Sequence, residues 1–347
     1  MRIAIVNDML MAVEALRRVL RSCPQHTIAW VARDGAEAVE MCAADRPDMI
    51  LMDLIMPVMN GAQATRLIMQ ASPCPILVVT ATVDGNVSLV FEAMGHGALD
   101  AVNTPVLGAD GQLAGAQSLL HKIEIIGHLI ARQPPARPAA PEGKAHPASG
   151  GRRPLVVLGS STGGPSALAQ ILSQLPRDLR ADIVIIQHIG REFSRELAIW
   201  LGTHCPFQVK VATPGCRPEA GTVWLAGTDD HMVLTKHGTL EYLVEPAECF
   251  YRPSVDVYFK SVAAHASPPG VAVLLTGMGR DGAEGLLALR RCGWHTLAQD
   301  EATSVVYGMP RAAAELRAAH AILPLGAIAD AIQQGLEIKK NHQPGPS

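Results

Sequence analysis

The chain has 347 residues, of which 48% are hydrophobic and 18% are charged, so it can fill the cores of two ordinary α/β domains. Its net charge of −3 shows no basic surplus, and we expect no nucleic-acid partner. The 7 cysteines form no C-x-x-C pair, and no apolar run approaches the roughly 18 residues that span a bilayer, so we expect no zinc or redox motif, no direct membrane insertion and a cytoplasmic location.

The first 133 residues alternate strand-like and helix-like segments. Three short apolar runs have the composition of buried strands, at residues 3–6, 49–53 and 76–80. Four apolar residues then recur at helical spacing, namely Leu119, Ile123, Ile126 and Ile130. This alternation predicts an α/β domain with a parallel sheet, ending in a helix that packs on that sheet.

Two carboxylates stand at the ends of predicted strands. Asp8 follows the first strand and Asp53 ends the run 49–53. Parallel strands bring their carboxyl ends to one edge, and converging carboxylates suit a hard divalent cation such as Mg²⁺. Helix caps or solvated side chains are the alternative for such a pair.

Residues 134–153 contain five prolines together with alanines and glycines, and they show no periodic apolar face. This composition predicts a flexible linker between the first domain and a second one at residues 154–342.

The second domain opens with an apolar run that ends in Gly159-Ser160-Ser161-Thr162-Gly163. Ser161 is the centre of a G-x-S-x-G pattern, in which the chain turns sharply and exposes the central hydroxyl as a nucleophile. A phosphate-binding or purely structural glycine turn is the alternative.

Two further apolar runs end near polar side chains, His188 after residues 182–187 and Asp281 after residues 271–277. A serine becomes a nucleophile when an imidazole takes its proton and a carboxylate orients that imidazole. Because functional groups gather beyond the carboxyl ends of strands in doubly wound α/β sheets, we predict a triad of Ser161, His188 and Asp281. Asp281 as a cap of a helix over 282–291, and His231 as a rival base, remain open.

Six motifs, in order, resemble those of CheB-type chemoreceptor methylesterases: G-S-S-T-G-G, Q-H, A-G-T-D-D-H, Y-R-P-S-V-D, T-G-M-G-R-D-G and Q-D-E-A-T-S-V-V-Y-G-M-P. The resemblance implies a protein-glutamate methylesterase that also deamidates glutamines as a glutaminase, acting on methyl-accepting chemoreceptors without an organic cofactor. It places the catalytic triad on Ser161, His188 and Asp281. It also places Thr162 and Met278 beside the site, with the Met278 N–H facing the oxyanion.

The segment I-L-M-D-L-I-M-P-V-M-N-G at residues 50–61 resembles the phosphoacceptor loop of a two-component receiver domain, which has a flavodoxin-like fold with a five-stranded parallel sheet. The resemblance implies that Asp53 accepts a phosphoryl group from a CheA-type histidine kinase and that this phosphorylation regulates the esterase. It makes Asp8, Asp53 and the Ile55 carbonyl ligands of Mg²⁺, and Thr80 the hydroxyl that follows the phosphoryl group.

Three residues depart from the receiver pattern. Asn7 replaces a second acidic residue and should weaken Mg²⁺ binding, Thr104 replaces the usual lysine, and Ala101 stands where an aromatic switch residue is common. These departures resemble the Wsp branch of the family, which is associated with surface sensing and cyclic-di-GMP output rather than flagellar control.

Two other functions fit parts of the sequence. A non-catalytic response regulator could use the Ser161 turn to bind an anion, although this does not explain why His188 and Asp281 also stand at strand ends. A generic small-molecule esterase would use the same triad on other substrates.

Overall fold

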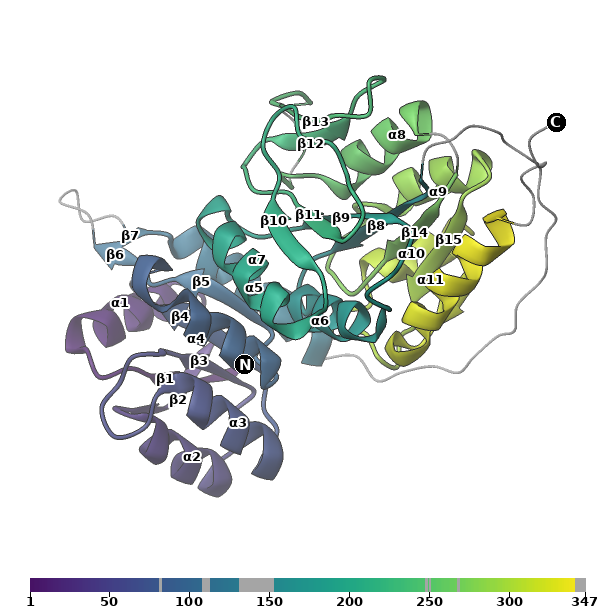
Figure 1. Ribbon diagram of the computed structural model, residues 1–347. Helices are drawn as coiled ribbons and strands as arrows, with labels where there is room; N and C mark the ends of the chain where they lie inside the picture. The colour runs from purple at the N-terminus through teal and green to yellow at the C-terminus, as the bar shows by residue number, and fades with distance from the viewer. Residues whose placement is uncertain are drawn as a thin grey trace, which may run out of the picture. The chain divides into compact units, whose positions relative to one another are not determined.

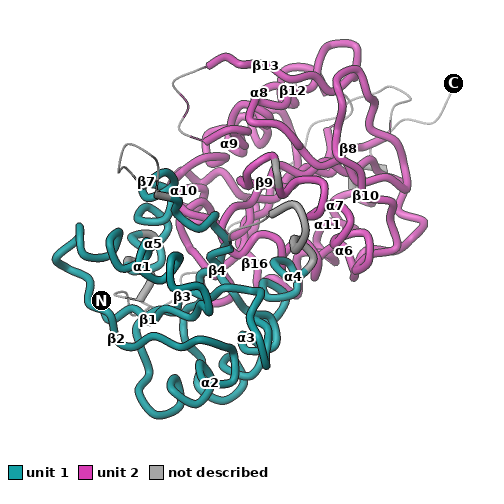
Figure 2. Tube along the Cα trace, turned by 90° about the vertical axis from the view of Figure 1, so that its left-hand side faces the viewer, with its two compact units in different colours: residues 1–136 teal, residues 137–347 magenta. Residues whose placement is uncertain are grey.

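The computed structural model describes residues 1–80, 83–107, 113–130, 153–246, 249, 251–266 and 269–340. The chain divides into two compact units, residues 1–136 and 137–347, which Figure 2 shows in different colours. The predicted linker at 134–153 lies outside the described residues except for Arg153.

The N-terminal unit is built on five parallel strands in the order β2-β1-β3-β4-β5. The strands are β1 (Arg2–Val6), β2 (Thr27–Ala32), β3 (Met49–Met52), β4 (Ile76–Thr80) and β5 (Asp100–Asn103), with a short antiparallel pair of β6 (Val106–Leu107) and β7 (Leu113–Ala114). The predicted flavodoxin-like sheet is therefore confirmed, and its three inner strands are apolar because helices cover both faces.

Five helices cover this sheet: α1 (Leu10–Arg21), α2 (Gly35–Ala44), α3 (Gly61–Ala71), α4 (Val83–Gly95) and α5 (Ala116–Ile130). Helices α2, α3 and α4 pack side by side, while α1 contacts α5 (Figure 1). The predicted apolar face of α5 is confirmed for Leu119, Ile123 and Ile126, which are at most 1% exposed and belong to one core cluster with α1 and the inner strands.

The C-terminal unit is built on seven parallel strands in the order β10-β11-β9-β8-β14-β15-β16. They are β8 (Leu155–Ser160), β9 (Asp182–Gln187), β10 (Gln208–Val211), β11 (Thr222–Leu225), β14 (Val271–Leu274), β15 (His295–Gln299) and β16 (Ala321–Leu323). The strands β12 (His231–Leu234) and β13 (Leu240–Leu243) form a separate antiparallel pair. The predicted doubly wound, mostly parallel fold is confirmed.

Six helices flank the larger sheet: α6 (Gly164–Gln174), α7 (Arg191–His204), α8 (Val255–His265), α9 (Ala283–Arg291), α10 (Met309–Glu315) and α11 (Leu325–Lys340). Helix α6 packs against α7 and α11, whereas α9 packs against α8 and α10, so the sheet lies between two helical layers (Figure 1). All six residues of β8 are buried, as a central strand between two such layers requires.

The strand order creates a switch point beside β8. From β8 the chain continues through α6 to β9 on one side, while from the adjacent β14 it continues through α9 to β15 on the other side. The connections that leave β8 and β14 therefore run to opposite sides, and in such sheets ligands bind at the carboxyl ends of the strands beside a switch point of this kind.

The core position of α5 gives a test of the N-terminal unit. Replacing Ile123 by alanine removes a fully buried side chain and should lower the free energy of unfolding of this unit by about 2–5 kcal/mol. Gln117→Ala, on the exposed side of the same helix, is the control and should change it by less than about 0.5 kcal/mol. Urea unfolding of the full chain, monitored by hydrogen exchange of the backbone amides in β1 and β3, measures the effect of each substitution. Equal effects of the two substitutions would contradict the packing of α5 on the sheet.

Candidate active site

Ser161 occupies the turn between β8 and α6, and glycines set the path of that turn. Gly163 has a φ of 77°, in the left-handed region that glycine favours. Gly164 has no room for a side chain, because a Cβ there would lie 2.8 Å from Ser160 Oγ. The Ser161 N–H donates to the carbonyl oxygen of Thr276 at 3.0 Å, which ties the turn to the segment after β14. Ser161 is thereby held at the carboxyl end of β8, at the switch point of the sheet.

Gln187, the last residue of β9, holds the same turn from the other side. Its Nε2 donates to the carbonyl oxygens of Ser161 at 2.8 Å and His188 at 3.1 Å, and its Oε1 accepts from Ser160 Oγ at 2.6 Å. The His188 N–H also donates to the Ser160 carbonyl oxygen at 3.0 Å. Sequence reasoning assigned no role to Gln187; a buried amide at the end of an otherwise apolar strand was the available signal.

His188 and Asp281, predicted from two separate strand ends, are in contact. Nε2 of His188 lies 2.7 Å from Oδ2 of Asp281, and the two side chains are only 7% and 10% exposed. The other ring nitrogen, Nδ1, is buried and has no hydrogen-bond partner in the described part of the chain. Among the described residues, no hydrogen bond joins the Ser161 hydroxyl to the His188 ring. The structure thus pairs two of the predicted groups and holds the third on the neighbouring strand end.

The Asp281 carboxylate lies at the N-terminus of α8. Its Oδ1 accepts from Ser254 Oγ at 2.7 Å and from the Asp256 N–H at 3.0 Å, and its Oδ2 accepts from the Val255 N–H at 2.7 Å. Burial raises the pKa of Asp281, but the hydrogen bond and charge of His188, together with the donors from Ser254 and Asp256, outweigh it and hold the pKa below its ordinary value. The helix terminus adds a favourable potential, so this carboxylate stays ionised.

The interpretation of Asp281 as a cap of its own following helix is wrong. Helix α9 begins at Ala283 with Gly282 as its N-cap, and no side chain caps it. The donors that Asp281 accepts from belong to α8, whose N-cap is Ser254.

His231, the rival base, is fully buried and already committed to the backbone. Its Nδ1 accepts from the Ser254 N–H at 3.1 Å, which requires Nε2 to carry the proton that it donates to the Pro246 carbonyl oxygen at 3.1 Å. Taking a proton from a substrate or a serine would break one of these bonds. His231 therefore supports Ser254, the residue that contacts Asp281, rather than competing with His188.

The predicted neighbours of Ser161, Thr162 and Met278, belong to the segments that follow β8 and β14. Gly277 is so close to Ser161 that a Cβ on it would lie 2.7 Å from the serine Cβ. Met278 follows directly, and its N–H donates to no backbone oxygen in the described residues. Thr162 is buried, and its carbonyl oxygen accepts from Thr276 Oγ1 at 2.9 Å.

The Y-R-P-S-V-D motif leads into α8 and contacts both His188 and Asp281. The Tyr251 ring lies against the His188 imidazole. Asp256 accepts from the Gly285 N–H at 2.6 Å and so links α8 to α9. Burial, offset by the Gly285 hydrogen bond and reinforced by the charge of Asp281, raises the pKa of Asp256 to about 6.

In the N-terminal unit, Asp53 lies directly after β3 and is 7% exposed. Its Oδ1 accepts from the Leu54 N–H at 2.7 Å and its Oδ2 accepts from Asn7 Nδ2 at 3.0 Å. Burial raises the pKa of Asp53 to about 6; the N–H groups of Leu54 and Ile55 oppose this rise, and the charge of Asp8 adds to it. Two carboxylates are therefore held close enough to repel each other.

Two buried hydroxyls complete the edge of this sheet. Thr80 ends β4 and Thr104 follows β5, and the Thr104 N–H donates to the Thr80 carbonyl oxygen at 2.9 Å. They are 1% and 8% exposed, and neither Oγ1 has a hydrogen-bond partner among the residues that the structure describes. Ala101, which stands where the resemblance predicts an aromatic switch residue, is buried within β5.

No three His, Cys, Asp or Glu side chains gather into a possible metal site anywhere in the described residues. Over the same residues, no helix is both long and apolar enough to cross a bilayer.

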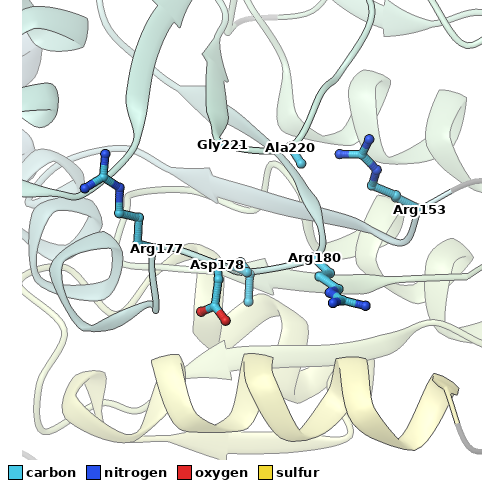
Figure 3. A pocket seen from close by; sticks show the side chains of 7 residues that line it. Arg153, Arg177, Asp178, Arg180, Ala220 and Gly221 are labelled. Atoms are coloured by element: carbon cyan, nitrogen blue, oxygen red, sulfur yellow. The ribbon is translucent and has the colours of Figure 1, made fainter.

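A separate pocket of about 450 Å³ lies at the amino ends of β8, β9 and β11, at the edge of the sheet opposite Ser161. Figure 3 shows Arg153, Arg177 and Arg180 spaced around it. It contains none of the predicted site residues.

Two family models match the chain: CheB methylesterase over residues 156–332 and response regulator receiver domain over residues 3–112. Proteins named protein-glutamate methylesterase/protein-glutamine glutaminase are similar over nearly the full length. One from Burkholderia thailandensis is 54% identical and covers 95% of this chain and 96% of the relative. One from Bordetella avium is 54% identical with 96% and 97% covered, and one from Pseudomonas fluorescens is 53% identical with 95% and 97% covered.

The C-terminal unit is also similar to the crystal structure of the Thermotoga maritima CheB methylesterase catalytic domain. The TM-score is 0.50 at 33% identity, over 54% of this chain and 99% of that chain. Fold and matches together define a response regulator whose receiver domain is joined to an esterase domain. The chain belongs to the CheB methylesterase family.

The surroundings of Asp281 predict a pH-dependent contribution to stability. Because its folded-state pKa lies below the unfolded value of about 3.9, its ionised form stabilises the fold fully above that pH and loses this effect as the pH falls through the folded pKa. The unfolding free energy lost in Asp281→Asn should therefore shrink as the pH falls below about 4. Urea unfolding from about pH 5 to about pH 2 measures it, with the exposed Asp178→Asn as control; a difference that stays undiminished at about pH 2 would contradict the assignment.

Proposed function

We propose that this chain is a protein-glutamate methylesterase, and a protein-glutamine glutaminase, that hydrolyses side-chain esters and amides of methyl-accepting chemoreceptors. The observation that supports this most is the buried hydrogen bond between His188 and Asp281 beside the Ser161 turn, at the switch point of a doubly wound sheet. The names of its relatives support protein glutamate esters and protein glutamine amides as the substrates, and the resemblance of the motifs supports chemoreceptors as the proteins that carry them.

In the proposed mechanism, His188 takes the proton of the Ser161 hydroxyl while the serine oxygen attacks the ester carbonyl carbon. Since Nε2 is hydrogen-bonded to Asp281, the nitrogen that accepts this proton is Nδ1. Nδ1 is buried and has no hydrogen-bond partner among the described residues. The ester C–O bond then breaks, and the imidazolium returns the proton to the leaving methoxide, which departs as methanol. Water, activated by the same nitrogen, cleaves the acyl-enzyme and restores the serine.

Two charges develop during this reaction, a positive one on the imidazole and a negative one on the carbonyl oxygen, and the site has a group that stabilises each. The ionised Asp281 stabilises the imidazolium, because it is held by three donors from α8 and remains charged. The Met278 N–H, next to the glycine that contacts Ser161, is assigned to the oxyanion, where one such donor is typically worth about 10²–10³ in rate. For a glutamine substrate the same steps release ammonia instead of methanol.

We propose that Asp53 is the phosphorylation site of the receiver and that its modification regulates the esterase. The residues fit a hard cation: the Asp8 and Asp53 carboxylates repel each other without one, and the Ile55 carbonyl in the same loop is assigned as a third oxygen ligand. When bound, Mg²⁺ would neutralise this pair and the incoming phosphoryl oxygens. Asn7 contributes an amide donor to Asp53 in place of a second acidic side chain, which should weaken the binding of the cation. Thr80 is assigned as the hydroxyl that follows the phosphoryl group.

The proposed partners are a chemoreceptor cytoplasmic domain as substrate and a CheA-type histidine kinase as phosphodonor, which places the protein in the cytoplasm. The finer assignment to the Wsp branch rests on Asn7, Ala101 and Thr104 and would make surface sensing the output. A small-molecule esterase is the alternative, and it would cleave simple esters as fast as methylated receptor.

Ser161→Ala should abolish methanol release from methylated receptor membranes, lowering the rate at least about 10³-fold, because the change removes the oxygen that forms the acyl-enzyme. Ser173→Ala, on the exposed end of α6, is the matched control and should keep the full rate. Release of labelled methanol measures both; full activity in Ser161→Ala would rule out this nucleophile.

Asp53→Asn should prevent stable phosphorylation by a small-molecule phosphodonor, because the amide offers no anionic oxygen to attack phosphorus. In the unchanged chain, removing Mg²⁺ with a chelator should have the same effect. Phosphate incorporation is measured with Asp45→Asn, an exposed aspartate paired with Arg2, as control. Undiminished incorporation into Asp53→Asn would place the acceptor elsewhere.

A further inference from the structure

The imidazole of His188 is bounded by a second side chain besides Asp281. The rings of His188 and Tyr251 are parallel, with planes 4° apart and centroids separated by 4.3 Å. Tyr251 comes from the segment between β13 and α8, whereas His188 follows β9, so this is a tertiary contact between distant parts of the chain.

The loop after β14 supports the same tyrosine. Gly279 has a φ of 81°, and a Cβ placed on it would lie 3.3 Å from the Tyr251 hydroxyl oxygen. This turn also carries Asp281, two residues further on. The tyrosine therefore lies between the imidazole and the loop that delivers its carboxylate partner. Burial, together with the charge of Asp281, raises the pKa of Tyr251, so its ring stays a neutral phenol.

A single hydrogen bond does not determine the plane of an imidazole. The bond from Nε2 to Asp281 Oδ2 still allows the ring to turn about the line that joins these two atoms. Such a turn would move Nδ1, the nitrogen assigned to the serine proton, out of place. A ring stacked on one face prevents this motion, because the turn would drive the imidazole edge into the aromatic face.

We propose that Tyr251 is a positioning residue of the esterase: its aromatic face fixes the plane of the His188 ring, so that Nδ1 is presented to Ser161, and it stabilises the imidazolium that forms during the reaction. This rests on the proposed function. The face of a ring attracts a cation, and offset parallel stacking is a favoured arrangement of planar rings. The role belongs to the ring, so phenylalanine should replace tyrosine.

The test compares Tyr251→Phe with Tyr251→Leu in the full chain. The first readout is the rate at which a fluorophosphonate labels the serine, which needs the base but no receptor. The second is kcat and KM for methylated receptor membranes. Tyr251→Phe should stay within about threefold of the unchanged chain in both readouts. Tyr251→Leu should lower the labelling rate and kcat about 10-fold and leave KM unchanged.

A pH profile separates positioning from a general loss of structure. Without the aromatic face the imidazolium loses a stabilising contact, so the acid limb of the labelling profile should move to lower pH by about half a unit or more in Tyr251→Leu, and should not move in Tyr251→Phe. If Tyr251→Leu melts below the assay temperature, Tyr251→Met, whose flexible unbranched side chain adapts to the space without presenting a flat face, takes its place.

The outcomes are distinct. Equal labelling rates and equal pH profiles for the leucine, or methionine, and phenylalanine variants would overturn the role of Tyr251 while leaving the esterase intact. Loss of activity in Tyr251→Phe as large as in Tyr251→Leu would also overturn it, because the effect would then belong to the hydroxyl. Failure of the unchanged chain to be labelled at Ser161 or to release methanol would instead reject the proposed function itself.

Discussion

The arrangement of the catalytic unit depends on one ion held at a helix terminus. The Asp281 carboxylate accepts three hydrogen bonds from the first residues of α8 and a fourth from His188. A buried carboxylate without such partners would be protonated, since burial alone raises its pKa. Because the N-terminus of α8 supplies these donors, the buried carboxylate keeps its negative charge. The imidazole of His188 therefore has a fixed anion to bind.

Sheet topology explains why the remaining groups lie within reach of that ion. Neighbouring strands β9, β8 and β14 end at the same edge, so Ser160 and Asp281, which are far from His188 in the chain, both form hydrogen bonds with it. The loops after β8 and β14 diverge, and close contacts at Gly164 and Gly277 bring the serine turn against both adjacent segments. The receiver uses the same geometry on a smaller sheet, where Asp53, Thr80 and Thr104 follow adjacent strands.

Much of the fold and of the candidate site could be predicted from the sequence. Buried parallel strands have continuous apolar runs, and the polar residues that follow these runs are easy to identify. Both sheets were predicted in this way, and His188 and Asp281 were predicted to meet. The donors from Ser254 and Val255, the Gln187 bridge and the stacking of Tyr251 were not predictable, since they depend on how α8 and its preceding segment dock on the sheet. Sequence also left His231 open as a base, and only its two backbone hydrogen bonds decide against it.

The central claim is that an ionised Asp281 makes His188 an effective base for Ser161. The most direct measurement is the rate of fluorophosphonate labelling at Ser161 in Asp281→Asn, compared with Asp178→Asn and with the unchanged chain at neutral pH. Asp281→Asn should be labelled at a rate at least about 10²-fold lower, with the peptide carrying the label identified by mass spectrometry, whereas Asp178→Asn should be labelled at the unchanged rate. Labelling of Ser161 at an undiminished rate in folded Asp281→Asn would contradict it.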